Sequence, residues 1–216
     1  MFDLSKVSLS VFLPETSEVE IASACKAAIE KQMYSVSVPP TWVSRVSNHL
    51  RGSLVKTTVK ISFPLGVDLP EQKFLACLSA IKNGADEIDL VFNMGAAKSE
   101  DLLTLKREVV PIVNLCHTNN IKVNAVIEIH LLTIDLFEKT IHFLESVGVD
   151  RIATSAGFKG MKQPTISSKD FERIQSFLKS SEKIKLVGFG DTSDDLAVFL
   201  KTNVEVVEID HRKMLQ

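Results

Sequence analysis

The sequence predicts an α/β fold, a closed (β/α)8 barrel of the TIM type in one domain that spans residues 1–216. Three observations favour this fold. Short runs rich in β-branched residues alternate with helical patterns along the chain, as is typical of parallel sheets. There are eight such runs, the number of strands in this barrel. The glycine-rich phosphate loops of open nucleotide-binding sheets, G-x-G-x-x-G and G-x-x-x-x-G-K-S/T, do not occur.

The expected strands are short and mostly apolar, and they cover Val7–Leu13, Tyr34–Val38, Lys56–Ser62, Glu87–Phe92, Val123–Ile129, Arg151–Ser155, Ile184–Val187 and Val204–Ile209. The expected helices lie between them, several with Ser, Asp or Pro near the first turn, and cover Glu18–Gln32, Pro40–Leu50, Pro70–Lys82, Glu100–Cys116, Ile134–Val147, Ser168–Ser180 and Ser193–Lys201. No linker of low complexity divides the chain, which favours a single domain. In such a barrel, chemistry takes place where the strands end.

Composition narrows the classes of function. The chain has 25 basic and 27 acidic residues spread along its length, so no basic face is available for nucleic acid. Its three cysteines, Cys25, Cys77 and Cys116, are far apart, which favours reduced thiols and a cytoplasmic location over disulfides or a zinc site. No apolar run approaches the length of about 18 residues that a membrane span needs. We therefore expect a globular protein that binds neither nucleic acid nor membrane, and no metal site.

Two charged residues interrupt otherwise apolar strands. Asp89 lies in the Glu87–Phe92 strand and shares a side with Glu87 and Val91, because alternate residues of a strand point the same way. Lys185 lies in the seventh expected strand. A buried carboxylate or amine needs a partner and is common at functional sites. The alternatives are a structurally paired acid for Asp89 and a solvated strand-end lysine for Lys185.

Several short motifs occur in a specific order: Phe63–Gly66 after the third strand, Gly84–Phe92, Glu128 in the fifth strand, Thr154–Phe158 after the sixth, and Lys185-x-x-Gly188-x-x-x-Thr192. Together they resemble the deoxyribose-phosphate aldolases, class I aldolases on a (β/α)8 barrel, over nearly the whole chain. The resemblance implies reversible retro-aldol cleavage of 2-deoxyribose 5-phosphate to glyceraldehyde 3-phosphate and acetaldehyde, without metal or organic cofactor. The expected small-molecule partner is thus a sugar phosphate or a related aldehyde.

The resemblance also implies roles for individual residues. Asp89 corresponds to the family's aspartate and Lys185 to its second lysine, which together handle proton transfer and tune the nucleophile. Thr154, Ser155, Gly157 and Gly188 correspond to substrate-binding positions. The Schiff-base lysine should directly precede Thr154, and Ala153 stands there instead. Alanine has no amine, so this position cannot form the iminium that accepts electrons during cleavage.

Other departures accompany Ala153. The family's small Gly-Ser-Ser turn after the eighth strand, which helps to bind phosphate, is replaced by the charged run Glu208–Arg212. Asp191 replaces a neutral or basic residue, and Ser8–Pro14 lacks the acid and the lysine of the family's first strand. Ser37 stands where a cysteine is common. Several coordinated losses indicate natural divergence rather than one engineered change.

Two hypotheses therefore remain open, and whether the protein is an enzyme is undecided at this point. In the first, Asp89 and Lys185 carry an altered or weakened aldolase reaction. In the second, the barrel is a non-catalytic pseudoenzyme that binds a protein partner or senses a ligand. His130 and Arg151 could line the barrel, although a loop histidine and an arginine at the other end of its strand are the simpler interpretations. Barrels of this type commonly self-associate, so a homo-oligomer is possible under either hypothesis.

Overall fold

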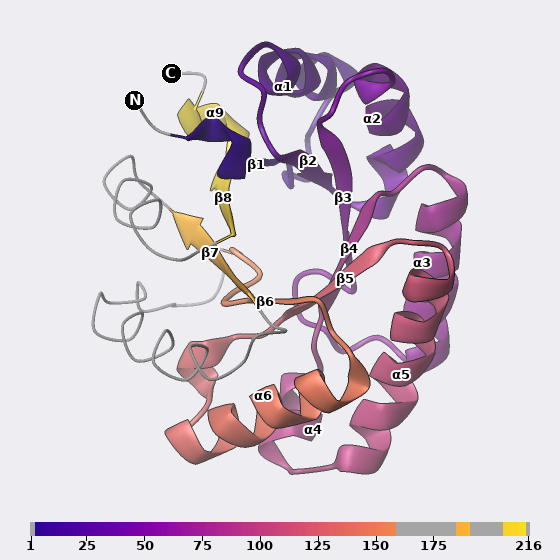
Figure 1. Cartoon of the computed structure of the whole chain (residues 1–216), viewed down its shortest axis with the longest axis vertical. Helices are drawn as coiled ribbons and strands as arrows, with labels where there is room; N and C mark the ends of the chain where they lie inside the picture. The colour runs from indigo at the N-terminus through magenta and orange to yellow at the C-terminus, as the bar shows by residue number, and fades with distance from the viewer. Residues whose placement is uncertain (1–2, 159–184, 191–204, 215–216) are drawn as a thin grey trace.

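The computed structural model describes residues 3–158, 185–190 and 205–214. Its strands are parallel and pair in sequence order, and β8 pairs back with β1, so the sheet closes into a barrel (Figure 1). The strands are β1 (Val7–Ser10), β2 (Ser35–Val38), β3 (Lys56–Ile61), β4 (Glu87–Val91), β5 (Lys122–Val126), β6 (Arg151–Ala153), β7 (Lys185–Gly190) and β8 (Val206–Asp210). The predicted parallel α/β fold is confirmed.

The helices lie outside the sheet (Figure 1). They are α1 (Glu18–Glu30), α2 (Val43–Leu50), α3 (Pro70–Lys82), α4 (Met94–Lys98), α5 (Leu102–Thr118), α6 (Ile134–Val147) and α9 (His211–Met214), with 3-10 turns at Leu4–Lys6, Pro40–Trp42 and Ile129–Leu131. The predicted helices Ser168–Ser180 and Ser193–Lys201 lie outside the described residues. The complete repeat of eight strand–helix units therefore stays a prediction. No described helix is long and apolar enough to cross a membrane.

Local sequence signals set the helix ends. Ser17 caps α1, where the Ser17 hydroxyl accepts from the Glu20 backbone N–H and the Glu20 carboxylate accepts from the Ser17 backbone N–H. Asp101 caps α5 by accepting from the backbone N–H of Thr104 at 3.1 Å. Gly148 ends α6 with a φ of 85°, a conformation that glycine adopts without steric cost.

Some element boundaries differ from those predicted. The first strand ends at Ser10 rather than Leu13, and the predicted helix from Glu100 begins at Leu102 after the short, unpredicted helix α4. Glu128 was expected in the fifth strand, but β5 ends at Val126. At Glu128 the backbone leaves the extended conformation, with φ −90° and ψ 85°, and enters the 3-10 turn that follows. Glu128 is therefore a loop residue at the carboxyl end of the barrel.

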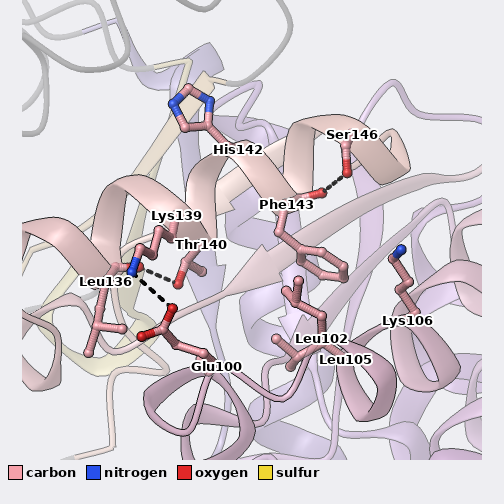
Figure 2. Close-up of a pocket in the computed structure, with 11 residues that line it drawn as sticks. Glu100, Leu102, Leu105, Lys106, Leu136, Lys139, Thr140, His142, Phe143 and Ser146 are labelled. Atoms are coloured by element: carbon pink, nitrogen blue, oxygen red, sulfur yellow. Dashed lines mark hydrogen bonds and ion pairs between the residues drawn. The ribbon is translucent and has the colours of Figure 1, made fainter.

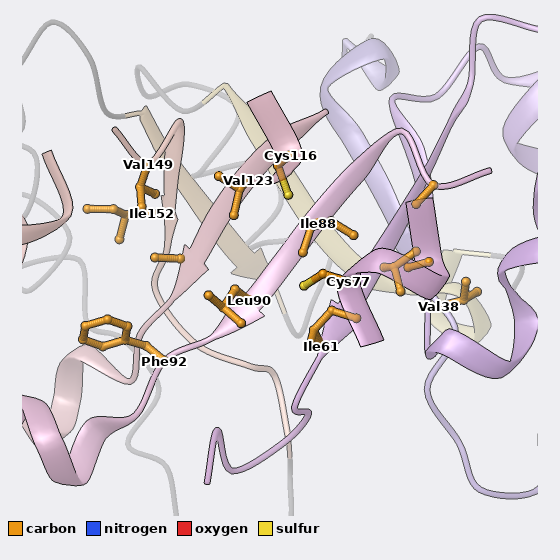
Figure 3. Packing of buried hydrophobic residues seen from close by; sticks show 14 of the residues in the cluster. Val38, Ile61, Cys77, Ile88, Leu90, Phe92, Cys116, Val123, Val149 and Ile152 are labelled. Atoms are coloured by element: carbon orange, nitrogen blue, oxygen red, sulfur yellow. The ribbon is translucent and has the colours of Figure 1, made fainter. Parts of the chain in front are cut away.

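Because alternate side chains of a strand point to opposite faces of the sheet, the protein has one core between the sheet and the helices and another inside the barrel. Outward-facing strand residues pack against the helices, and Figure 3 shows Ile61, Ile88, Leu90 and Val123 in this layer with Cys77 of α3. The inward-facing set is more polar. It includes the hydroxyls of Ser8 and Ser35, the charged chains described below and a small apolar cluster. Charged residues inside a barrel require partners, and these partners differ between the amino-terminal and the carboxyl-terminal end of the barrel.

The amino-terminal end of the barrel is closed by an ion-pair network. Arg151 donates to Glu87 at 2.8 Å and to Glu205 at 2.9 Å, and it also donates to the Tyr34 hydroxyl at 2.6 Å. Lys56 donates to the same Glu87 at 2.9 Å. These residues lie at or just before the starts of their strands. Arg151 is therefore buried inside the barrel at its amino-terminal end, opposite to the end where barrel enzymes place their catalytic groups.

Candidate active site

Asp89 lies in the middle of β4, faces the barrel interior and is only 3% exposed. The Asn124 side chain on β5 donates to its Oδ1 atom at 2.7 Å. Burial, followed by the nearby negative charge of Glu208, raises the pKa of Asp89 to about 7, although the positive charge of Lys60 opposes this shift. A carboxyl group with this pKa can both accept and donate a proton near neutral pH.

Lys60 is the interior residue that the sequence analysis missed. It lies on β3 directly opposite Asp89 in the strand register, is 1% exposed, and forms an ion pair with Glu208 of β8. Its amine also donates to the Ala156 carbonyl at 3.1 Å and lies 4.8 Å from the ring centroid of Phe12. Alternation could have revealed it, because Lys60 stands between the apolar residues Val59 and Ile61 just as Asp89 stands between Ile88 and Leu90.

Ala153 ends β6 and is completely buried. It belongs to a cluster of small apolar interior residues formed with Val91, Val126, Ala156 and Val206, against which Phe63 and Tyr34 pack. The position at which the resemblance expects a Schiff-base lysine therefore has an apolar side chain without an amine, packed among apolar neighbours.

The segment after β6 includes three of the predicted substrate-binding residues. Thr154 and Ser155 are buried, and the Ser155 hydroxyl accepts from the Gly157 backbone N–H at 3.0 Å. Gly157 has a φ of 76°, which favours glycine. Glu128 holds the same segment by accepting from the Ala156 N–H at 2.7 Å, and His130 lies 3.5 Å from the Glu128 carboxylate. Glu128 therefore fixes the loop that borders the candidate site.

Strand β7 includes Lys185 and Gly188, the other two predicted site residues. In the register, Lys185 lies opposite Arg151 of β6, and Gly188 lies opposite Val207 of β8. The side chain of Lys185 is outside what the structure describes, so its predicted pairing with Asp89 remains a prediction. The amine that lies opposite Asp89 in the register is that of Lys60.

The charged run after the eighth strand is divided between interior and surface. Glu208 is buried and pairs with Lys60, whereas Asp210 pairs with Arg212 at 2.9 Å. His211 is buried and its Nδ1 atom lies 3.2 Å from the Ser10 carbonyl. A carboxylate therefore occupies the interior near the site, where it disfavours a phosphate group.

Three polar atoms inside the barrel have no hydrogen-bond partner among the described residues: Ser37 Oγ, Thr58 Oγ1 and Asn124 Oδ1. Ser37 and Thr58 lie opposite each other on β2 and β3, and Asn124 lies opposite Asp89 on β5. An unpaired buried polar atom is costly and needs an explanation, such as a bound water or ligand. These atoms adjoin the Lys60 and Asp89 pair.

The other described features lie apart from the predicted site residues. Cys25, Cys77 and Cys116 are buried and unpaired, and burial raises the pKa of the Cys25 thiol to about 12, so that thiol is a poor nucleophile. The described residues contain no group of three or more metal-ligating side chains. A surface cavity of about 450 Å³ lies over α4, α5 and α6, where Phe143 points toward Leu102 and Leu105 (Figure 2). It includes none of the predicted site residues.

Comparisons with known proteins identify relatives of this chain. A family model for the DeoC/LacD aldolases matches residues 6–171. The deoxyribose-phosphate aldolase of Treponema denticola is 35% identical over 191 residues, which cover 87% of this chain and 85% of that protein. The aldolase of the same name from Streptococcus gordonii is 34% identical over 188 residues, covering 87% and 83%.

Solved structures show the same fold. An aldolase called QR15 superposes with a TM-score of 0.86 at 25% identity and covers 100% of this chain and 97% of its own. The tetrameric deoxyribose phosphate aldolase of Aeropyrum pernix superposes with a TM-score of 0.86 at 20% identity, covering 98% and 88%. The parallel barrel, the motifs at its strand ends and these matches lead to one conclusion: the chain belongs to the DeoC/LacD family of aldolases.

Proposed function

We propose that this protein is a complete single-domain (β/α)8 barrel that carries out reversible aldol cleavage of a carbonyl substrate other than the usual sugar phosphate. One observation carries the proposal: Asp89, with a pKa of about 7, lies opposite the buried amine of Lys60 in the barrel interior. Aldol chemistry by a class I aldolase needs such a proton-transferring acid and an amine. The reaction needs no metal or organic cofactor.

Cleavage of 2-deoxyribose 5-phosphate to glyceraldehyde 3-phosphate and acetaldehyde is weakened or lost in this proposal. Ala153 has no amine, and Glu208 places a carboxylate in the interior. Thr154, Ser155, Gly157 and Gly188 remain the proposed substrate-binding positions. Lys185 remains a candidate amine.

The second candidate function is a non-catalytic barrel that binds a protein partner or senses a ligand. The loss of the amine at Ala153 favours it, because alanine cannot form the Schiff base of the family reaction. A homo-oligomer fits either function, and the Aeropyrum pernix aldolase is tetrameric. A cytoplasmic location is proposed from the reduced cysteines. Neither proposal includes nucleic acid.

Borohydride trapping distinguishes the two functions. The protein is mixed with 2-deoxyribose 5-phosphate or with a neutral β-hydroxy ketone, reduced with borohydride, and measured by intact mass and peptide mapping. We expect a covalent adduct and measurable release of the aldehyde product with the neutral compound. A lysine-bearing family member trapped in parallel is the positive control. A folded protein that forms no adduct and releases no aldehyde would favour the non-catalytic barrel.

The Lys185→Ala variant tests the amine predicted from the resemblance. If Lys185 is the nucleophile or its essential partner, this variant should lose turnover while keeping its fold by circular dichroism. Full activity in Lys185→Ala would remove Lys185 from the reaction. That result would leave the proposed aldol cleavage intact, because the barrel interior contains a second amine.

A further inference from the structure

We infer that Lys60 is the Schiff-base amine of this protein and that its substrate is a neutral, apolar aldehyde or ketone. The inference rests on the proposed aldol cleavage and names the residue and substrate class of that site. It assigns the covalent step to β3 instead of β6, where Ala153 stands.

The position of Lys60 meets the geometric requirements for this role. It lies one residue before the end of β3, near the carboxyl-terminal end at which barrel enzymes place their chemistry. Asp89 lies opposite it on the neighbouring strand, and Glu208 pairs with it from β8. One carboxyl group can therefore take the proton of the ammonium while a second acts on the substrate.

The surroundings of Lys60 indicate a ligand rather than a purely structural pair. A buried ion pair is often no more stabilising than apolar residues of the same volume, so stability alone does not account for it. Thr58, two residues earlier on the same strand, has a buried hydroxyl without a described partner, as do Ser37 beside it and the Asn124 carbonyl next to Asp89. These atoms can hydrogen-bond to the oxygens of a hydroxy-carbonyl compound.

Three phenylalanines define the class of substrate. Phe12 and Phe63 have ring centroids 4.8 Å apart, and Phe63 and Phe158 have centroids 6.0 Å apart in an edge-to-face arrangement. Lys60 lies 4.8 Å from the centroid of Phe12 and 5.7 Å from that of Phe63. Phe158 is 37% exposed. The amine is thus bordered by aromatic rings and by carboxylates, which favour an apolar, uncharged carbonyl compound over a phosphate.

The proposed reaction balances without any added oxidant or reductant. The Lys60 ammonium transfers a proton to Glu208, and the free amine attacks the carbonyl carbon to form a carbinolamine. Glu208 then returns the proton to the carbinolamine hydroxyl, which leaves as water, and an iminium forms. The Asp89 carboxylate removes the proton of the β-hydroxyl group. The carbon–carbon bond then breaks, its electron pair forms an enamine, and the first aldehyde leaves. Asp89 returns the proton to the enamine carbon, and water hydrolyses the iminium to release the second carbonyl product and Lys60.

The test uses 4-hydroxy-4-phenylbutan-2-one, a neutral aromatic β-hydroxy ketone, as the probe and follows benzaldehyde release by absorbance. The same probe with borohydride should label Lys60, as located by peptide mapping. Lys60→Arg keeps the positive charge beside Glu208 but is not nucleophilic, so it should lose both the label and benzaldehyde release down to the buffer blank. Lys56→Arg is the matched control, because Lys56 belongs to the network at the opposite end of the barrel.

The Lys60→Met/Glu208→Leu variant guards against a folding defect, because it removes both charges together. It should fold, as judged by circular dichroism and thermal unfolding, and remain unlabelled. A label and turnover that depend on Lys185 instead would overturn the role of Lys60 and keep the proposed aldol cleavage. Absence of label and turnover in the folded wild type would overturn both. Equal labelling at Lys60 by 2-deoxyribose 5-phosphate would overturn the substrate class.

Discussion

The protein contains two buried lysine–glutamate pairs whose surroundings differ. Lys73 of α3 pairs with Glu108 of α5 at 2.8 Å, outside the barrel, and also donates to the carbonyls of Gly66 at 2.8 Å and Val91 at 3.0 Å. An ammonium has three N–H donors, and two of them are used by these backbone carbonyls. Lys60 of β3 pairs with Glu208 inside the barrel, where it also donates to the Ala156 carbonyl and lies near the rings of Phe12 and Phe63.

The difference indicates what each pair does. Lys73 connects the loop after β3 to the end of β4. Gly66 itself has a φ of 68°, and an added Cβ would lie 2.3 Å from the Phe92 carbonyl oxygen, so only glycine fits there. Lys73 therefore stabilises the fold by joining these two backbone segments. Lys60 instead lies among interior polar atoms that lack described partners and beside Asp89. Lys73 holds two backbone segments together, whereas Lys60 lies beside Asp89 near the carboxyl end of the barrel strands, where barrel enzymes place their chemistry.

The largest expected effect comes from removing the structural lysine. Lys73→Met leaves the buried Glu108 carboxylate without its counter-ion, which should lower the free energy of unfolding by about 3–5 kcal/mol. Urea unfolding at neutral pH measures this loss. The Lys73→Met/Glu108→Leu double variant is the control and should regain most of the stability. An unchanged unfolding midpoint in the single variant would contradict a structural role for this pair.

A smaller effect concerns the pH dependence that Asp89 introduces. Its native pKa of about 7 lies above its ordinary value of 3.8, so between these pH values the native state holds a proton that the unfolded chain has lost. The free energy of unfolding therefore falls as pH rises through this window and stays reduced above it. Asp89→Asn does not titrate, and Asn124 Oδ1, which has no described partner, can accept from the new amide.

The advantage of Asp89→Asn over the wild type should accordingly grow between pH 4 and 7, to at most about 4 kcal/mol at 1.36 kcal/mol per pKa unit. Urea unfolding of both proteins across this range measures the difference. Glu108→Gln provides a comparison outside the barrel, because burial also raises the pKa of Glu108. A difference that does not vary with pH would show that Asp89 has an ordinary pKa.

The sequence predicted the fold better than it predicted the site. Alternation of apolar and polar residues correctly placed Asp89 inside a strand, on one side with Glu87 and Val91, and the same alternation was present at Lys60. What local pattern could not show is the partner, because Glu208 lies 148 residues from Lys60 and meets it only when β8 closes on β1. The surroundings of Ala153 were equally hidden, since they come from β4, β5 and β8. The end of β5 before Glu128 could not be predicted either, because the pattern of apolar residues does not indicate the turn that follows this strand.

The Lys60→Met/Glu208→Leu variant should have the smallest effect on stability. Its effect contrasts most clearly with the loss of stability expected for Lys73→Met. This variant removes the two charges together and places apolar groups beside Phe12 and Phe63. The protein therefore loses the attraction between the charges, but it no longer pays the free-energy cost of burying them. The free energy of unfolding should stay within about 1 kcal/mol of the wild type or increase. Loss of stability comparable to that of Lys73→Met would mean that Lys60 also holds the fold together. Retained stability with lost carbonyl labelling would separate the two lysines, one required for the structure and the other for the reaction.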